Sequence, residues 1–247
     1  GKYSKEYQRK HIVGDLMKTI LLKLSGPLQS WGTSSKFETR ETDYYPSKSA
    51  IIGMVGACMG LKRDEDEKIR KLNELKFLVR VDQAPGLCKD YQTVEKTKKN
   101  GAFDRNYVTN RYYLEDGVFL VALSHEDIEL IDEIIKSLEN PYFQPYMGRR
   151  SCPLPGDFLL GARDLDPLET VKETKWLAQD WFKKKNKNYK AYLYGDREVL
   201  EGDLRLRNDR VVSFSQKERS FSPRYEARSY QDFSLEFETD HDPFTQL

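Results

Sequence analysis

Few of the residues that mark catalytic or metal centres occur in this chain of 247 residues. Three histidines and three cysteines are scattered along it, without a CxxC pair or an HExxH cluster. A GxxxxGK(S/T) phosphate loop is also missing. These absences argue against a zinc site, a disulfide framework and P-loop chemistry. Acidic side chains are plentiful but scattered, so we expect no catalytic residue, no metal and no cofactor.

Long apolar runs and a strong net charge are missing as well. No stretch approaches the roughly 20 apolar residues of a membrane span, and the N-terminus has no apolar signal segment. The net charge is only +1, so a nucleic-acid surface must come from local clustering of cations. Unpaired cysteines are typical of a reducing compartment. The sequence therefore predicts a cytoplasmic protein with no membrane partner.

Residues 1–16 fit poorly into the fold. Met17 stands directly before the first strand-like run and resembles a natural start. The preceding residues could be a tag, a linker or the tail of a fused upstream domain, and the sequence leaves these alternatives open.

Hydrophobic periodicity predicts an α+β core between residues 17 and 166. The expected elements are a strand (19–24), a helix (50–61), a strand (77–82), a strand (118–123), a helix (126–139) and a strand from 158. This order is the split βαβ pattern of a ferredoxin-like domain. In the second strand, Phe77, Val79 and Val81 alternate with the residues between them, which predicts one buried and one exposed face.

Two capping features support the first helix. Ser47 or Ser49 is a suitable N-cap, and Gly60 is a suitable stop. In the second helix, the expected apolar stripe consists of Ile128, Ile131, Ile135 and Leu138.

The insertion at residues 85–113 is polar, basic and aromatic. Between Lys89 and Arg111 it holds six cations and three carboxylates, a local charge of +3, and the whole insertion contains five aromatic residues. A connection of this length without core residues is usually functional or disordered. Cations that follow phosphates and aromatic faces that stack bases are typical of single-stranded RNA binding.

Two glycine-bounded loops suggest a place for a nucleic-acid backbone. Residues 146–153 contain Gly148, which lets the backbone approach a ligand closely, and the adjacent guanidiniums of Arg149 and Arg150. Residues 24–32 form a similar loop after the first strand. Either loop alone would be interpreted as an ordinary turn, but together they favour a phosphate-binding surface.

Residues 167–247 are less regular and mainly β. Strand-like segments occur near 191–194 and 198–206, and a lysine-rich run at 183–187 is interpreted as a solvated loop. The region is either a small second subdomain or an elaboration packed on the core.

Five motifs in order carry a family resemblance: KLSGPLQSWG, YPSKSAIIGMVGACMGLKRD, CKDYQTV, TNRYYL and PYMGRRSCPLP. They resemble the CasD family, the fifth Cas family, of type I-E CRISPR systems. The match runs from residue 17 to about residue 161, with a further similar stretch, RSFSPRYEARSY, near the C-terminus. The resemblance implies a ferredoxin-like (RRM-like, RAMP-type) domain with a thumb-like hairpin insertion.

The same resemblance implies a non-catalytic subunit of the Cascade surveillance complex that grips the 5′ handle of the CRISPR RNA. Its partners would be the backbone subunits and the large PAM-reading subunit, with target DNA reached only indirectly through the complex. The thumb would press against the first guide segment, although residues 96–104 depart from the family pattern. The residues implied in RNA binding are Gln29, Ser30, Trp31, Lys48, Arg111, Tyr146, Gly148, Arg149 and Arg150.

Three alternatives remain at this stage. In type I-C systems the related subunit cuts precursor RNA without metal, using a tyrosine, a lysine and a histidine, but no histidine lies near Lys48 in this sequence. A generic RNA-binding module would leave the order of the motifs unexplained. A fused upstream effector domain would add an activity that these 247 residues lack.

Overall fold

The computed structural model describes residues 17–32 and 39–234. The expectation for residues 1–16 lies outside this part of the chain. Within the described ranges, no helix is long and apolar enough to cross a membrane. The fold is α+β, with more strand than helix.

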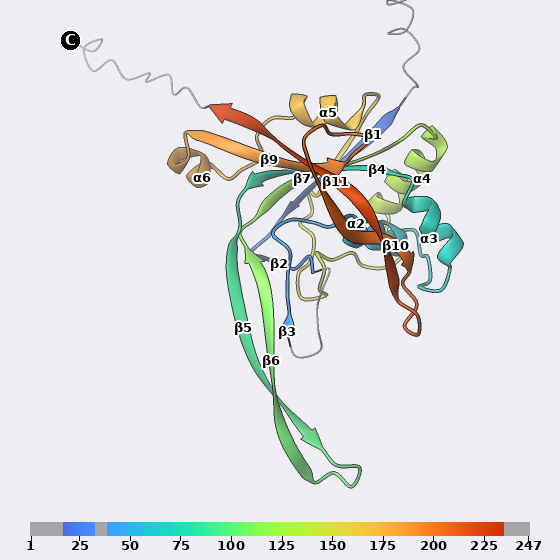
Figure 1. Ribbon diagram of the computed structural model, residues 1–247, viewed down its shortest axis with the longest axis vertical. Coiled ribbons are helices and arrows are strands. Elements are labelled where there is room, and N and C mark those ends of the chain that lie inside the picture. Colours follow the sequence, from blue (N-terminus) through green and yellow to red (C-terminus); the bar gives the residue numbers. More distant parts are fainter. Residues whose placement is uncertain (1–16, 33–38, 235–247) are drawn as a thin grey trace, which may run out of the picture.

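A seven-stranded antiparallel sheet forms the centre of the molecule (Figure 1). Its order is β10-β11-β9-β4-β7-β1-β8. The strands are β1 (Lys18–Ser25), β4 (Lys76–Gln83), β7 (Val118–His125), β8 (Leu159–Arg163), β9 (Asn188–Asp196), β10 (Asp203–Ser213) and β11 (Ser220–Ser234). The four strands predicted in the N-terminal part are all present, and β7 lies between β1 and β4.

Helices cover both faces of this sheet. On one face, α2 (Lys48–Cys58), α3 (Asp66–Leu72) and α4 (Ile128–Glu139) share the main apolar core with β1, β4 and β7. On the other face, α5 (Pro167–Glu173) packs through Val171 on Leu21, Leu78 and Leu120. The short helix α6 (Asp180–Lys185) lies beside the start of β9.

The helix signals in the sequence are largely confirmed. The Ser47 side chain accepts a hydrogen bond from the Ala50 amide, and Gly60 follows α2 with φ of +77°. Helix α4 buries Ile131 and Leu138 as predicted, but its third fully buried residue is Ile134 rather than Ile135.

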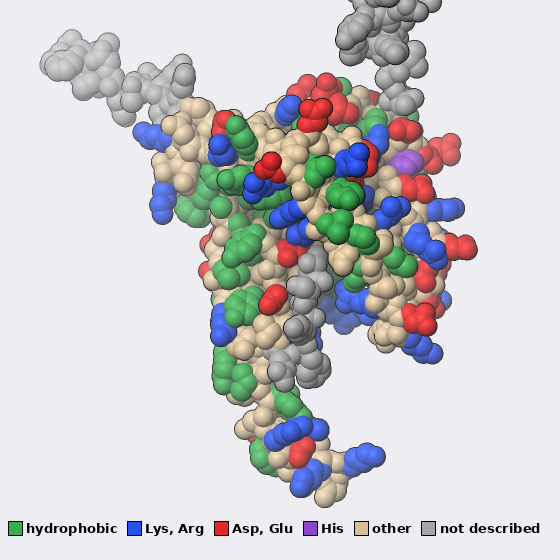
Figure 2. All heavy atoms as spheres, viewed as in Figure 1, with side chains coloured by type: hydrophobic (Ala, Val, Ile, Leu, Met, Phe, Trp, Pro, Cys, Tyr) green, Lys and Arg blue, Asp and Glu red, His purple; other side chains and the backbone are tan. Residues whose placement is uncertain are grey.

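A long hairpin, which we call the thumb, projects from the sheet (Figure 1). It consists of β5 (Gly86–Thr97) and β6 (Phe103–Glu115), so the predicted hairpin insertion is present. Two short strands pair with β6 near its base: β2 (Leu28–Gln29) antiparallel and β3 (Thr39–Arg40) parallel. Figure 2 shows Lys and Arg side chains gathered at its tip.

The prediction of a half-exposed strand at residues 77–82 is wrong. All residues of β4 after Lys76 are buried, including Arg80 and Asp82, because the core shared with α2, α3 and α4 covers one face and α5 packs on the other. The Arg80 guanidinium donates two hydrogen bonds to the Asp82 carboxylate, at 2.5 and 3.0 Å. It also donates to the carbonyl oxygens of Val171 and Thr174, so the buried charges are fully paired.

The C-terminal region continues the central sheet. Strand β9 pairs with β4, and β11 pairs with β9. The strand predicted at 198–206 begins later, at Asp203, because residues 197–199 form a turn after β9. A buried ionic cluster joins these C-terminal strands to α2. Within the cluster, Arg224 donates hydrogen bonds to Asp196, Asp209 and Glu226.

Candidate nucleic-acid interface

The two glycine loops lie against each other. The Ser30 amide donates a hydrogen bond to the Met147 carbonyl oxygen at 3.1 Å. A Cβ atom at residue 148 would lie 1.5 Å from the Ser30 carbonyl oxygen, and Gly148 has φ of +81°. The two loops that the sequence assigned to one surface are therefore in contact. The close approach that Gly148 allows is to the Ser30 backbone, a contact that the sequence did not predict.

Loop 146–153 is closed by its own backbone. The Met147 amide donates to the Cys152 carbonyl oxygen at 2.7 Å, and the Cys152 amide donates to the Arg149 carbonyl oxygen at 2.8 Å. Met147 and Cys152 are buried beneath the loop, and Tyr146 is half-buried where it bridges to Pro153. This closure leaves the two arginines at the turn, where Arg150 is exposed.

The Arg149 side chain rests on the base of the thumb. Its guanidinium lies 4.3 Å above the centre of the Tyr113 ring, and Nη2 donates to the Arg40 carbonyl oxygen at 3.1 Å. Nη1 is buried and has no hydrogen-bond partner within the described residues, and the same is true of Arg111 Nε. An unpaired guanidinium nitrogen at a buried position costs free energy, so both are suited to an anionic ligand.

One face of the thumb continues this arrangement toward the tip. Because side chains alternate along a strand, Arg105, Tyr107, Arg111 and Tyr113 of β6 share a face. Arg105 lies 4.6 Å above the Tyr107 ring, just as Arg149 lies above Tyr113. Cations and aromatic rings thus alternate from the arginine loop outward, which is the side-chain pattern of single-strand binding surfaces.

Three predicted contact residues are buried instead. Gln29 and Trp31 are 0% and 1% exposed, and Ser30 is 5% exposed. Gln29 Nε2 donates to the Gly117 carbonyl oxygen at 2.7 Å, while its Oε1 accepts from Trp31 Nε1 at 3.0 Å. Their side chains therefore hold the first loop to the thumb base and do not form part of the surface.

Lys48, which was expected to line the RNA surface, is also buried. It is 5% exposed, and its ammonium lies 2.8 Å from the Asp196 carboxylate. Burial lowers the pKa of Lys48, and the Asp196 charge opposes that shift. The backbone amide of Lys48 donates to Asp209, so the residue fixes α2 to the C-terminal strands. It is not available to line an RNA surface.

Sequence reasoning missed Arg40, Arg105 and Tyr107. The last two could have been found, because alternation along residues 105–113 places them on the face of Arg111. Arg40 has no local signal, since it reaches the site through the parallel pairing of β3 with β6, in which Arg40 lies opposite Arg111.

Among the described residues, no hydrogen bond joins Lys48 and His125, since Lys48 pairs with Asp196. His125 lies at the far end of β7 from the thumb, about 23 Å away at roughly 3.3 Å per residue. Its Nδ1 accepts a hydrogen bond from the Asp127 amide. No group of three metal-ligating side chains occurs among the described residues.

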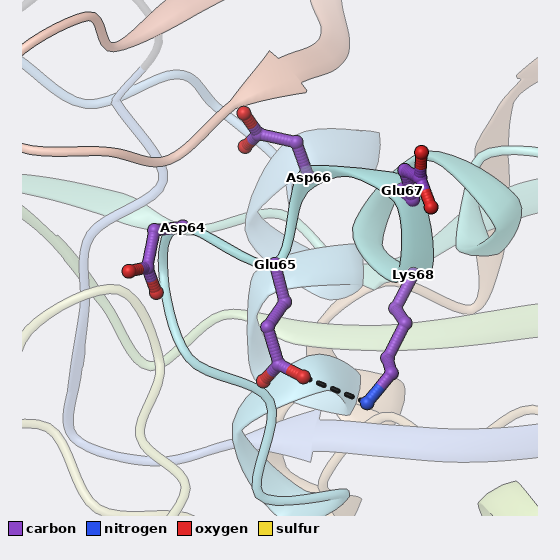
Figure 3. A pocket seen from close by; sticks show the side chains of 5 residues that line it. All are labelled: Asp64, Glu65, Asp66, Glu67 and Lys68. Carbon is purple, nitrogen blue, oxygen red and sulfur yellow. Dashed lines mark hydrogen bonds and ion pairs between the residues drawn. The ribbon is translucent and has the colours of Figure 1, made fainter.

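The carboxylates around an acidic hollow on the surface do not converge on a common point. It is lined by Asp64, Glu65, Asp66, Glu67 and Lys68 (Figure 3). Glu65 pairs with Lys68 at 2.7 Å, and the other three carboxylates point away from one another. Their separation gives no shared position for a substrate or a cation.

Comparison with known proteins identifies the family. The family described as CRISPR-associated protein (Cas_Cas5) matches residues 19–226. The CRISPR system Cascade subunit CasD of Escherichia coli (strain K12) is 35% identical over 157 residues, which cover 58% of this chain and 70% of that protein.

Two solved structures agree with this match. A chain of a CRISPR RNA-guided surveillance complex superposes with a TM-score of 0.70 at 31% identity, covering 87% of this chain and 90% of that chain. A second, described as the crystal structure of a Cas protein, gives 0.61 at 30% identity, covering 86% and 94%. The chain therefore belongs to the CasD family, the fifth family of CRISPR-associated proteins.

Proposed function

We propose that the chain is a non-catalytic, cytoplasmic RNA-binding subunit of a type I-E Cascade complex. It grips the 5′ handle of the CRISPR RNA and caps the backbone subunits beside the large PAM-reading subunit. The relationship to a Cascade subunit and to a chain of an RNA-guided surveillance complex supports this role. Target DNA is reached through the complex.

One observation supports the handle site above all others. Arg149 is fixed between the Tyr113 ring and the Arg40 carbonyl oxygen, yet keeps one buried nitrogen without a partner in the described residues. Arg111, on the same face of β6 as Tyr113, also keeps a buried nitrogen, Nε, without a partner in the described residues. The two guanidiniums are suited to adjacent phosphates, and the fixed Arg149 side chain has little entropy left to lose on binding.

We therefore assign phosphate contacts to Arg111, Arg149 and Arg150, with Tyr146 at the edge of the loop. Gln29, Trp31, Lys48 and Gly148 hold the framework beneath them.

We infer the domain assignment from the strand order. The order β4-β7-β1-β8, with α2 and α4 as the two connecting helices, supports a ferredoxin-like (RRM-like, RAMP-type) core at residues 17–166. The thumb is then an insertion at about 85–113, and residues 167–247 are a C-terminal elaboration, in which β9, β10 and β11 extend the same sheet.

The competing function is metal-independent cleavage of precursor RNA. The purified chain should leave repeat RNA intact, with and without EDTA, because the Lys48 ammonium is buried in an ion pair with Asp196 and His125 lies at the end of β7 away from the thumb. Specific cleavage that is lost in Lys48→Met or His125→Ala would favour the nuclease.

Assembly is the second experiment. The chain has a net charge of only +1, so alone it should bind handle RNA weakly and with strong salt dependence. Tight binding by the lone chain that is insensitive to salt would contradict a site shared with partner subunits. Co-purification with the backbone and large subunits on a guide RNA tests the assignment to Cascade.

A further inference from the structure

A second concentration of cations lies around α6, at the start of β9. Residues 172–190 contain seven lysines and two carboxylates, a local charge of +5 in a chain of net charge +1. We call Lys183, Lys184 and Lys185 the lysine corner. Figure 2 shows Lys and Arg side chains at this edge of the molecule, over α6. No ion pair within the described residues involves any of these three.

The lysine corner is held by a rigid aromatic base. Trp176 stacks on Tyr189 and Phe233, with ring centres 5.4 and 5.3 Å apart, and Phe182 of α6 packs against the same group. Trp176 Nε1 donates to the Asp82 carbonyl oxygen at 2.6 Å. This packing fixes the backbone of α6, so its lysines are presented together and do not lie on an unstructured loop. The interpretation of residues 183–187 as a solvated loop is therefore wrong for residues 183–185, which belong to α6.

An exposed aromatic ring lies beside these cations, because Trp181 of α6 is 52% exposed. The exposed rings of Tyr192 and Tyr230 are not part of this surface. They point to the opposite face of the sheet from Tyr189 and Phe233, on which α6 packs. Lysine ammonium groups bind phosphates as point charges, and exposed rings accept any base by stacking. The combination suits a single strand of nucleic acid and gives no means of reading its sequence.

The lysine corner is separate from the arginine loop. The segment leading into α6 is fixed to β4, because the Gln179 amide donates to Gln83 Oε1 at 3.0 Å. The arginine loop is fixed instead to the segment of β2, which pairs with β6. The two sites thus lie on opposite sides of the thumb base (Figure 1), and a ligand at one leaves the other open.

We infer that the lysine corner is a second, sequence-independent binding site for the phosphate backbone of single-stranded nucleic acid. Its chemistry is common to RNA and single-stranded DNA. The site does not depend on the 5′-handle role proposed for the arginine loop.

The test uses labelled oligothymidylate, oligouridylate and a DNA duplex of equal length, measured by fluorescence anisotropy over a range of salt. The variant Lys183→Gln/Lys184→Gln/Lys185→Gln removes three charges without removing the helix. Its matched control is Lys62→Gln/Lys71→Gln/Lys136→Gln, which removes three exposed charges elsewhere on the surface. Circular dichroism and thermal melting check folding of both.

The lysine-corner variant should bind single strands at least tenfold more weakly, and its log–log salt slope should fall by about 2, at roughly 0.7 per phosphate contact. The control variant should match wild type. Trp181→Ala should weaken the binding of single strands more than the binding of the duplex, since only unstacked bases can reach the ring. Oligothymidylate and oligouridylate compared with each other show whether DNA or RNA is preferred, and either preference supports the site.

Single-strand affinity that is unchanged in the lysine-corner variant would overturn the inference and favour a protein partner for this surface. An equal loss in the control variant would overturn it too, because net charge alone would then explain binding. The arginine variant Arg149→Ala/Arg150→Ala separates this from the handle proposal. It should weaken the binding of handle RNA. The lysine substitutions should still lower the affinity for oligothymidylate in its presence.

Discussion

Gly148 and Ser30 approach each other more closely than any side chain at residue 148 would permit. A Cβ there would lie 1.5 Å from the Ser30 carbonyl oxygen and 2.7 Å from its carbonyl carbon. Both atoms belong to the backbone, so neither can turn aside as the end of a flexible side chain could. The position of Arg149 and Arg150 relative to the thumb therefore depends on a glycine at residue 148.

Gly148→Ala should destabilise the protein by at least about 2 kcal/mol. A left-handed backbone angle alone costs a non-glycine residue about 1–3 kcal/mol, and the overlap with Ser30 adds to that. Gly101→Ala is the matched control, because Gly101 has the same φ of +81° but no neighbouring atom within 4 Å. Urea denaturation of both variants gives the free energies of unfolding.

The difference between the two variants isolates the contact with Ser30. Gly148→Ala should lose more stability than Gly101→Ala, and it should also weaken handle binding. Equal losses for the two substitutions would mean that loop 146–153 moves freely away from Ser30, which would contradict the rigid loop pair.

Lys48→Met should destabilise the chain by about 3 kcal/mol, the lower end of the range for breaking a buried ion pair. The lower end applies because Asp196 still accepts from Arg224 and from the Phe77 amide. Lys68→Met is the control, since Lys68 forms an exposed ion pair with Glu65 that is worth at most about 1 kcal/mol.

The same variant tests the corrected role of Lys48. Handle affinity of the folded Lys48→Met protein, measured well below its melting temperature, should equal that of wild type. A tenfold loss of affinity without a change in stability would mean that Lys48 does contact RNA.

Cys58→Ala should change how stability depends on alkaline pH. Burial raises the pKa of the Cys58 thiol from 9.0 to about 11. Between these values the folded state holds a proton that the unfolded state has released, so stability falls as pH rises through this interval. The loss is up to about 2 kcal/mol. The variant should show a smaller decline than wild type between pH 9 and pH 11 in urea denaturation, and identical declines would contradict the assignment.

Local signals were sufficient for much of the fold. Ser47 and Gly60 mark the two ends of α2. Both could be recognised in the sequence, because capping and left-handed termination depend on a few adjacent residues. Burial of β4 on both faces could not be predicted from its alternation. The residues that cover Arg80, such as Val171 and Thr174, lie more than ninety positions away in the sequence.

The same distinction between local signals and tertiary contacts applies to the candidate site. Arg149 and Arg150 stand out in the sequence because glycine and paired cations occur together in a short loop. Lys48 and Trp31 stand out in the same way, yet the fold buries both. A sequence motif gives the residues of a site without telling which of them face solvent. That depends on tertiary partners such as Asp196, 148 positions from Lys48.

Handle affinity of the Arg149→Ala/Arg150→Ala variant tests the central claim most directly. Each charge-assisted arginine–phosphate contact is worth about 1.5–3 kcal/mol, so losing both should weaken guide-complex assembly at least tenfold. Arg149→Lys/Arg150→Lys keeps the charge but loses the planar fork, and it should fall between alanine and wild type. Thermal melting shows that both variants fold. A double alanine variant that melts like wild type and assembles with unchanged affinity would contradict the assignment of this loop to the RNA handle.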